Sequence, residues 1–159
     1  MIRAGFLIDA LGASQQSIAL TSQMNELMAQ KANYSMCLFY RNYDRSLISP
    51  HFAMFSEYVA WSFSGIAIAT DIKSAKTLLK CPGPKKKFFY VWSTEWAFNN
   101  RLSYSDLAKV YQADDMQLIV RSESHYDIVS KLWQRPAKII EEFNYEQVAD
   151  FLTEESQGL

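Results

Sequence analysis

The feature of this sequence that most restricts its fold is a repeated exchange between two hydrophobic patterns. Short runs in which nearly every residue is apolar alternate with segments in which apolar residues recur every three or four positions. The first pattern is typical of strands buried on both faces, and the second of helices with one apolar stripe. Strands that alternate with helices favour βαβ units with right-handed crossovers. We therefore expect an α/β fold with a single Rossmann-like, doubly wound, mostly parallel sheet and helices on both faces.

The apolar runs predict about six strands, at residues 4–10, 35–40, 65–70, 88–92, 117–120 and 137–140. The segments between them predict helices, the first with an apolar face of Leu20, Met24, Leu27 and Met28. The aromatic-rich segment after Pro50 also predicts a helix, with Gly65 ending it in a left-handed conformation. Ser103 and Ser122 or Ser124 are expected to begin later helices.

Length and composition set further limits. A chain of 159 residues that is 49% hydrophobic and 21% charged is expected to form one folded domain over residues 1–159. Its net charge of −1 excludes a generally basic nucleic-acid binder. No apolar run approaches the roughly 18–20 residues of a membrane span.

The N-terminus and the cysteines predict a cytoplasmic protein. Residues 1–9 lack the pattern of a signal peptide. Cys37 and Cys81 belong to no CxxC pair or Cys/His cluster, so we expect two ordinary buried thiols and no metal site.

The expected fold itself selects candidate site residues, because ligands of open parallel sheets bind beyond the carboxyl ends of the strands. Five predicted strands are followed by polar or small residues that should converge on one edge of the sheet. These are Asp9, Gly12, Ala13 and Ser14; Thr70 and Asp71; Ser93, Thr94 and Glu95; Arg121, Ser122, Glu123, Ser124 and His125; and Glu141 and Glu142.

Three of these positions have two interpretations each. The loop through Gly12, Ala13 and Ser14 could present backbone amides to an anion, or Ser14 or Ser17 could simply cap a helix, since GxGxxG and GxxxxGK[ST] are absent. His125 could be a general acid or base at a helix start, or a residue of the cap. Glu95, between Trp92 and Trp96, could bind a sugar, or the two tryptophans could belong to the core.

Two segments suggest macromolecular partners. Lys85, Lys86 and Lys87 precede Phe88, Phe89 and Tyr90, a combination seen in single-strand nucleic-acid binders and also at solvated strand ends. The aromatic residues between Phe52 and Phe63 cover more than one stripe of a helix, so part of this segment is a candidate interface with a protein partner or a second copy.

The order of these parts resembles the N-terminal, acceptor-side half of GT-B-fold glycosyltransferases, notably small glycosyltransferase-like proteins of bacteriophages. The likeness rests on residues 6–9 with 12–14, on residues 89–96, and on residues 118–126 with 139–144. In that family most of the nucleotide-sugar site lies in a second, C-terminal domain. The resemblance therefore implies a domain that lacks this site.

These observations give one leading function and two alternatives. We expect an accessory or binding protein that is not catalytic alone and binds a partner or small ligand at the strand carboxyl ends, without a cofactor. The first alternative is a glycosyltransferase that acts as an oligomer or with a partner chain on a nucleotide sugar, with His125 or Asp9 as base and Glu95 binding sugar. The second is a nucleic-acid-associated protein that uses Lys85–Lys87.

Overall fold

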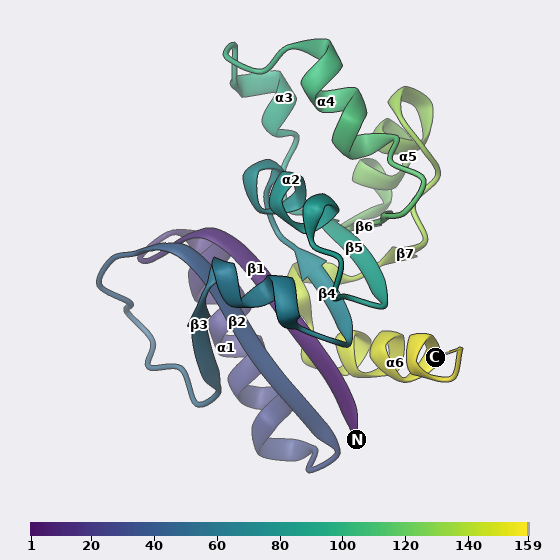
Figure 1. Cartoon of the computed structure of the whole chain (residues 1–159). Helices are drawn as coiled ribbons and strands as arrows, with labels where there is room; N and C mark the ends of the chain where they lie inside the picture. The colour runs from purple at the N-terminus through teal and green to yellow at the C-terminus, as the bar shows by residue number, and fades with distance from the viewer. Residues whose placement is uncertain (159) are drawn as a thin grey trace.

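A single sheet of seven parallel strands organises the chain, in the order β3-β2-β1-β4-β5-β6-β7. This computed structural model describes residues 1–158 (Figure 1). The strands are β1 (Ile2–Leu11), β2 (Tyr34–Tyr43), β3 (Ala53–Ser56), β4 (Ile66–Ala69), β5 (Lys86–Val91), β6 (Gln117–Val120) and β7 (Lys138–Ile139). The helices are α1 (Gln15–Gln30), η1 (Glu57–Ser62), α2 (Ile72–Lys80), α3 (Glu95–Phe98), α4 (Tyr104–Tyr111), α5 (Glu123–Leu132), η2 (Glu141–Phe143) and α6 (Tyr145–Ser156). The structure thus has the predicted Rossmann-like α/β fold.

The strand order reverses between β1 and β4. From β1 the chain moves outward through β2 to β3, returns through η1, and places β4 on the other side of β1. It then moves outward through β5, β6 and β7. Because the crossovers on the two sides of this point lead away from each other, the carboxyl ends of β1 and β4 border a crevice.

Helices bury both faces of the sheet, so the inner strands are apolar throughout. On one face, Leu20 and Met24 of α1 and Phe151 of α6 pack with Phe6 and Tyr90 of the strands. The other face carries the second part of the core, formed by η1, α2, α4 and α5. Its buried side chains include Ala60, Leu78, Tyr111 and Val129.

The helices begin at capping residues, several of which the sequence predicted. Ser14, rather than Ser17, is the N-cap of α1, and its hydroxyl accepts a hydrogen bond from the Ser17 amide. Ser103 and Ser122 cap α4 and α5 in the same way. A side-chain oxygen at the cap pairs one of the amides that the first helical turn leaves without a partner.

The segment after Pro50 was predicted incorrectly. It forms the short strand β3 and the 3₁₀ helix η1 instead of one α-helix, and β3 is the seventh strand, which the sequence analysis missed. Pairing with β2 favours an extended conformation here over a helix, because β3 lies beside β2 with Phe55 opposite Phe39. All strand pairs are parallel, in agreement with the predicted mostly parallel sheet.

Gly65 does not have the predicted left-handed conformation, since no glycine of residues 1–158 has a positive φ. Close approach explains this glycine: a Cβ atom at this position would lie 2.6 Å from the carbonyl oxygen of Arg3 and 2.9 Å from the ring of Phe63.

Two simpler predictions concern the cysteines and the membrane. Cys37 and Cys81 are free and buried, as expected, and burial raises the pKa of the Cys37 thiol to about 11. Within residues 1–158, none of the helices combines the length and the apolar character needed to cross a membrane.

Candidate functional site

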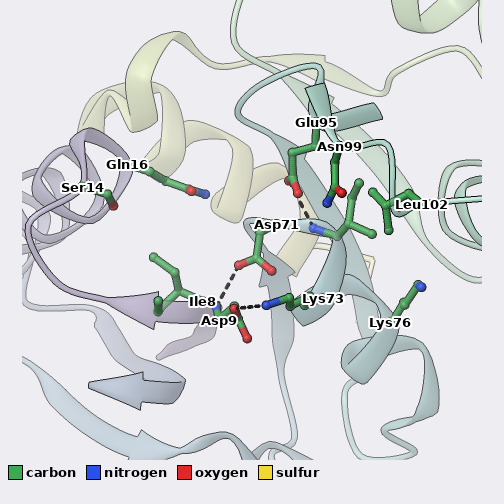
Figure 2. A pocket seen from close by; sticks show the side chains of 12 residues that line it. Ile8, Asp9, Ser14, Gln16, Asp71, Lys73, Lys76, Glu95, Asn99 and Leu102 are labelled. Carbon is green, nitrogen blue, oxygen red and sulfur yellow. Dashed lines mark hydrogen bonds and ion pairs between the residues drawn. The ribbon is translucent and has the colours of Figure 1, made fainter. Parts of the chain in front are cut away.

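A crevice of about 300 Å³ opens where the strand order reverses. The end of β1 and the start of α1 form one side, the start of α2 forms the floor, and α3 with the following loop forms the other side (Figure 2). Its lining residues are Ile8, Asp9, Ala10, Ser14, Gln16, Asp71, Ile72, Lys73, Lys76, Glu95, Asn99 and Leu102.

Three carboxyl groups meet in this crevice, each from a different strand end. Asp9 lies near the end of β1, Asp71 follows β4, and Glu95 follows β5. Two hydrogen bonds fix them: the Asp9 amide donates to Asp71 Oδ2 at 2.8 Å, and the Ile72 amide donates to Glu95 Oε1 at 3.2 Å. The predicted convergence of Asp9, Asp71 and Glu95 on one edge is therefore what the structure shows.

Glu95 is the carboxyl group with the most unusual protonation. Burial, followed by the negative charge of Asp71 and more weakly that of Asp9, raises its pKa to about 7. The Ile72 amide and Lys73 act in the opposite direction but do not cancel these effects. Glu95 therefore gains and loses a proton near neutral pH, which an ordinary glutamate does not.

Asp71 has a mainly structural role. It is the N-cap of α2: Oδ1 accepts from the Ser74 amide at 2.8 Å, while Oδ2 accepts from Asp9. Burial raises the pKa of this carboxyl, and the hydrogen bonds from Ser74 and Asp9 oppose that rise. Both oxygens are engaged, so Asp71 fixes the start of α2 against β1.

Asp9 is held by two cations. Lys73 Nζ lies 2.9 Å from Oδ2, and Arg41 Nη1 lies 3.3 Å from Oδ1. Arg41 also donates from Nε to Glu57 at 2.7 Å, and this hydrogen bond raises the pKa of the guanidinium. Asp9 thus belongs to an ion-pair network that crosses from β1 to β2 and α2.

The loop after β1 contributes less to the crevice than its sequence suggested. The Gly12 amide donates to the Ser17 hydroxyl at 3.2 Å, so this amide is engaged within the loop. Gly12 and Ala13 are not among the lining residues, whereas Ser14 is. Gln16 donates to the carbonyl oxygen of Thr70 and joins α1 to the end of β4.

The two tryptophans beside Glu95 in sequence belong to aromatic clusters. Trp92 stacks on Phe143 with ring centroids 5.3 Å apart, and Trp96 packs edge-on against Tyr111 at 5.0 Å. Neither indole lines the crevice. Thr94 precedes α3 without a side-chain capping bond and does not line the crevice either.

The residues after β6 form a separate group, outside the crevice. Arg121 lies with its guanidinium 4.4 Å from the ring centroid of Trp92 and its Nη2 3.6 Å from Glu142. The Ser122 hydroxyl accepts from the His125 amide at 3.2 Å. The remaining two predicted ligand-binding residues, Glu123 and Ser124, are exposed.

His125 itself is half-buried beside Arg121. Burial, and then the positive charge of Arg121, lower the pKa of the imidazole, while the Val91 backbone opposes this. Its Nδ1 atom is buried and has no hydrogen-bond partner within residues 1–158. His125 is not among the residues that line the crevice, whereas Asp9 is, so the two do not share this site.

The lysine run lies at the amino end of β5, the opposite edge of the sheet from the crevice. Lys86 pairs with Glu155 at 2.8 Å and Lys87 with Asp115 at 3.0 Å, while Lys85 is exposed. The aromatic residues that follow, Phe88, Phe89 and Tyr90, are at most 2% exposed. They are core residues and offer no face on which a nucleic-acid base could stack.

The lining residues that sequence reasoning did not single out include the polar Lys73, Lys76 and Asn99, and Leu102. Lys73 and Lys76 stand three positions apart on α2, just after Asp71, so the helical period offered a signal for them. Nothing in the sequence marked the short helix α3 that positions Asn99 and Leu102. Within residues 1–158, no group of three or more His, Cys, Asp or Glu side chains is arranged to hold a metal ion.

Comparisons of this chain with known proteins returned no match, whether to a family model, to a curated protein or to a solved structure.

Proposed function

We propose that this chain is a binding domain that holds a small, hydroxyl-bearing ligand in the crevice between β1 and β4. The observation that carries the proposal is the position of Glu95. This carboxyl has a pKa of about 7 and lines a cavity of about 300 Å³ at the reversal point of the sheet. Ligands of open α/β sheets bind at such points, and this volume is at the lower end of the range for small-molecule sites.

One carboxyl oxygen of Glu95 can accept a hydrogen bond from a ligand. Oε1 accepts from Ile72, and Oε2 has no hydrogen-bond partner within residues 1–158. A carboxylate accepts hydrogen bonds from hydroxyl groups, and a protonated carboxyl can also donate one. Asn99 is a second candidate contact, because its Oδ1 accepts from the Arg101 amide and leaves the amide nitrogen for another partner.

The crevice suits a ligand with little net charge. Lys73 is paired with Asp9, and Lys76 lies 3.4 Å from Asp106 at the rim. Both lysines of the lining are therefore engaged by carboxylates, and the raised pKa of Glu95 lets this carboxyl be protonated near pH 7. Within residues 1–158, the crevice thus offers no free cation to an anionic ligand. Neutral polyols, including monosaccharides and nucleosides, combine several hydroxyl groups with the required size.

The test is titration calorimetry of the purified chain with a panel of neutral monosaccharides, polyols and nucleosides, preceded by a thermal-shift screen. Glu95→Gln keeps the size of the side chain and removes its charge, and the exposed Glu26→Gln is the matched control. We expect a ligand that loses at least tenfold in affinity with Glu95→Gln and keeps it with Glu26→Gln. A panel without any binding, or equal binding by both variants, would contradict the proposal.

A second candidate function is favoured by the same pKa. A carboxyl that titrates near pH 7 is suited to general acid–base catalysis, so the site could serve glycosyl transfer when a partner chain supplies the nucleotide-sugar site. This candidate predicts turnover of a nucleotide sugar only in such an assembly. Glu95→Gln should then abolish turnover while the assembly persists.

Cellular location is part of the same proposal. We place the protein in the cytoplasm, where reduced thiols are maintained. The two free, buried cysteines, Cys37 and Cys81, support this location.

A further inference from the structure

Strand β3 forms one outer edge of the sheet, because it pairs with β2 and with no other strand. An edge strand presents unpaired backbone groups to other chains, and proteins usually protect it with charges, proline or a covering segment. β3 itself, Ala53–Ser56, contains neither proline nor a charged residue. The backbone hydrogen bonds of residues 1–158 include none from another loop to these four residues.

Large exposed apolar side chains are concentrated in the part of the chain that includes this edge strand. Of the eleven in residues 1–158, six lie between positions 43 and 61. They are Tyr43, Leu47, Phe55, Tyr58, Val59 and Trp61. Tyr58 is 77% exposed and Trp61 46% exposed, and both are residue types that dominate binding energy in protein interfaces.

The same surface contains a groove. A hollow of about 290 Å³ is lined by Phe39, Phe55, Val59 and Phe63, and also by Arg3. The projecting side chains of Tyr58 and Trp61 belong to the same short segment as its wall. One surface thus carries both an apolar projection and an apolar groove.

Charge decides which partner fits. Between Ala53 and Ser62 the one charged side chain is Glu57, and Arg41 Nε lies 2.7 Å from its carboxylate. Within this segment, two copies would therefore meet without like-charge repulsion, while the exposed Arg3 lies outside it on β1. A charged partner would find no exposed countercharge on this segment, whereas a second copy brings a matching groove and a matching projection.

We propose that β3 and η1 form the interface of a symmetric homodimer, in which the β3 strands of two copies pair antiparallel. A two-fold axis is the arrangement in which one surface can serve both partners. The pairing would join the two sheets and provide the missing hydrogen bonds of both edges. The crevice lies on the other side of β2 and remains open.

The test is the mass of the purified chain by sedimentation velocity and light scattering over a wide concentration range. We expect a dimer that dissociates on dilution. Tyr58→Lys and Trp61→Lys place a charge in the interface and should each yield a monomer, whereas Leu132→Lys, on α5 and 53% exposed, should remain a dimer.

Hydrogen–deuterium exchange of residues 53–56 separates this interface from any other. These amides should exchange slowly in the dimer and quickly in Tyr58→Lys at the same concentration. A monomer at every concentration would overturn the proposal. So would a dimer that persists in both lysine variants while the amides of residues 53–56 exchange freely.

Discussion

Glu95 and Ile72 are joined by a hydrogen bond in which the first amide of α2 donates to a carboxyl from beyond β5, at 3.2 Å. The Asp71 carboxylate occupies the cap of the same helix. Two carboxyl groups therefore share the positive end of α2, and their mutual repulsion contributes to the raised pKa of Glu95. The pH dependence of stability should report this arrangement.

Replacing Glu95 should remove part of that pH dependence. Its pKa rises from 4.5 in an ordinary glutamate to about 7 in the folded chain, so the folded state binds the proton more tightly than the unfolded state. The free energy of unfolding should therefore fall as the pH rises from about 4.5 to about 7, by at most about 3 kcal/mol. Urea unfolding at several pH values should show a shallower fall for Glu95→Gln. An unchanged slope would mean that Glu95 titrates normally.

Removing the cap of α2 should destabilise the fold. Asp71→Ala deletes the acceptor for the Ser74 and Asp9 amides, and we expect a loss of about 1–3 kcal/mol in the free energy of unfolding. Asp71→Asn keeps an oxygen for the cap and should lose less. Both losses would be measured by urea denaturation. Equal losses in the two variants would show that the capping hydrogen bond does not account for the destabilisation.

Tyr90 supports a strained turn after β7. Its hydroxyl donates to the Ile140 carbonyl oxygen at 2.5 Å and accepts from the Phe143 amide at 3.3 Å. Glu142 and Phe143 both have positive φ, which costs energy in residues other than glycine. Tyr90→Phe leaves two buried backbone groups without this partner, so thermal or chemical unfolding should show a loss of about 1–3 kcal/mol. Tyr145→Phe, whose hydroxyl bonds to Glu146 at an exposed position, should lose much less.

Two glycines should respond differently to the same substitution. In Gly65→Ala the new methyl group would approach the Arg3 carbonyl oxygen to 2.6 Å, so the strands must shift, at a cost of about 1–3 kcal/mol. In Gly12→Ala the nearest atom is Asp44 Cβ at 3.4 Å, an ordinary contact. Thermal unfolding should therefore show a clear loss for the first variant and little change for the second. Similar values for the two would contradict the close approach at Gly65.

The strands that the sequence predicted best are those buried on both faces. Residues 117–120 were predicted as a strand, and β6 has the same bounds. The failure at β3 has a physical reason. Phe52, Phe55, Val59 and Phe63 recur every three or four positions, as in a helix, but pairing with β2 overrides this local pattern.

The sequence predicted only part of the candidate site, because the fold class locates strand ends but not the order of the strands. The carboxyl-end rule selected Asp9, Asp71 and Glu95 correctly as neighbours, because the fold class alone places strand ends on one edge. It could not separate them from Arg121 and His125, since that requires the strand order. β6 lies beyond β5, so its polar residues stand beside Trp92 rather than in the crevice.

The position of β1 also has a consequence for folding. β1 lies in the middle of the sheet, yet its neighbours come much later in the chain: Ile2 pairs with Tyr34, and Ala4 with Ile66. Parallel contacts between such distant segments give a high contact order, which slows folding. During synthesis, β1 must wait until β4 has been made before both of its edges are paired. Until then, the apolar segment Ile2–Leu11 has unpaired backbone groups and is open to aggregation.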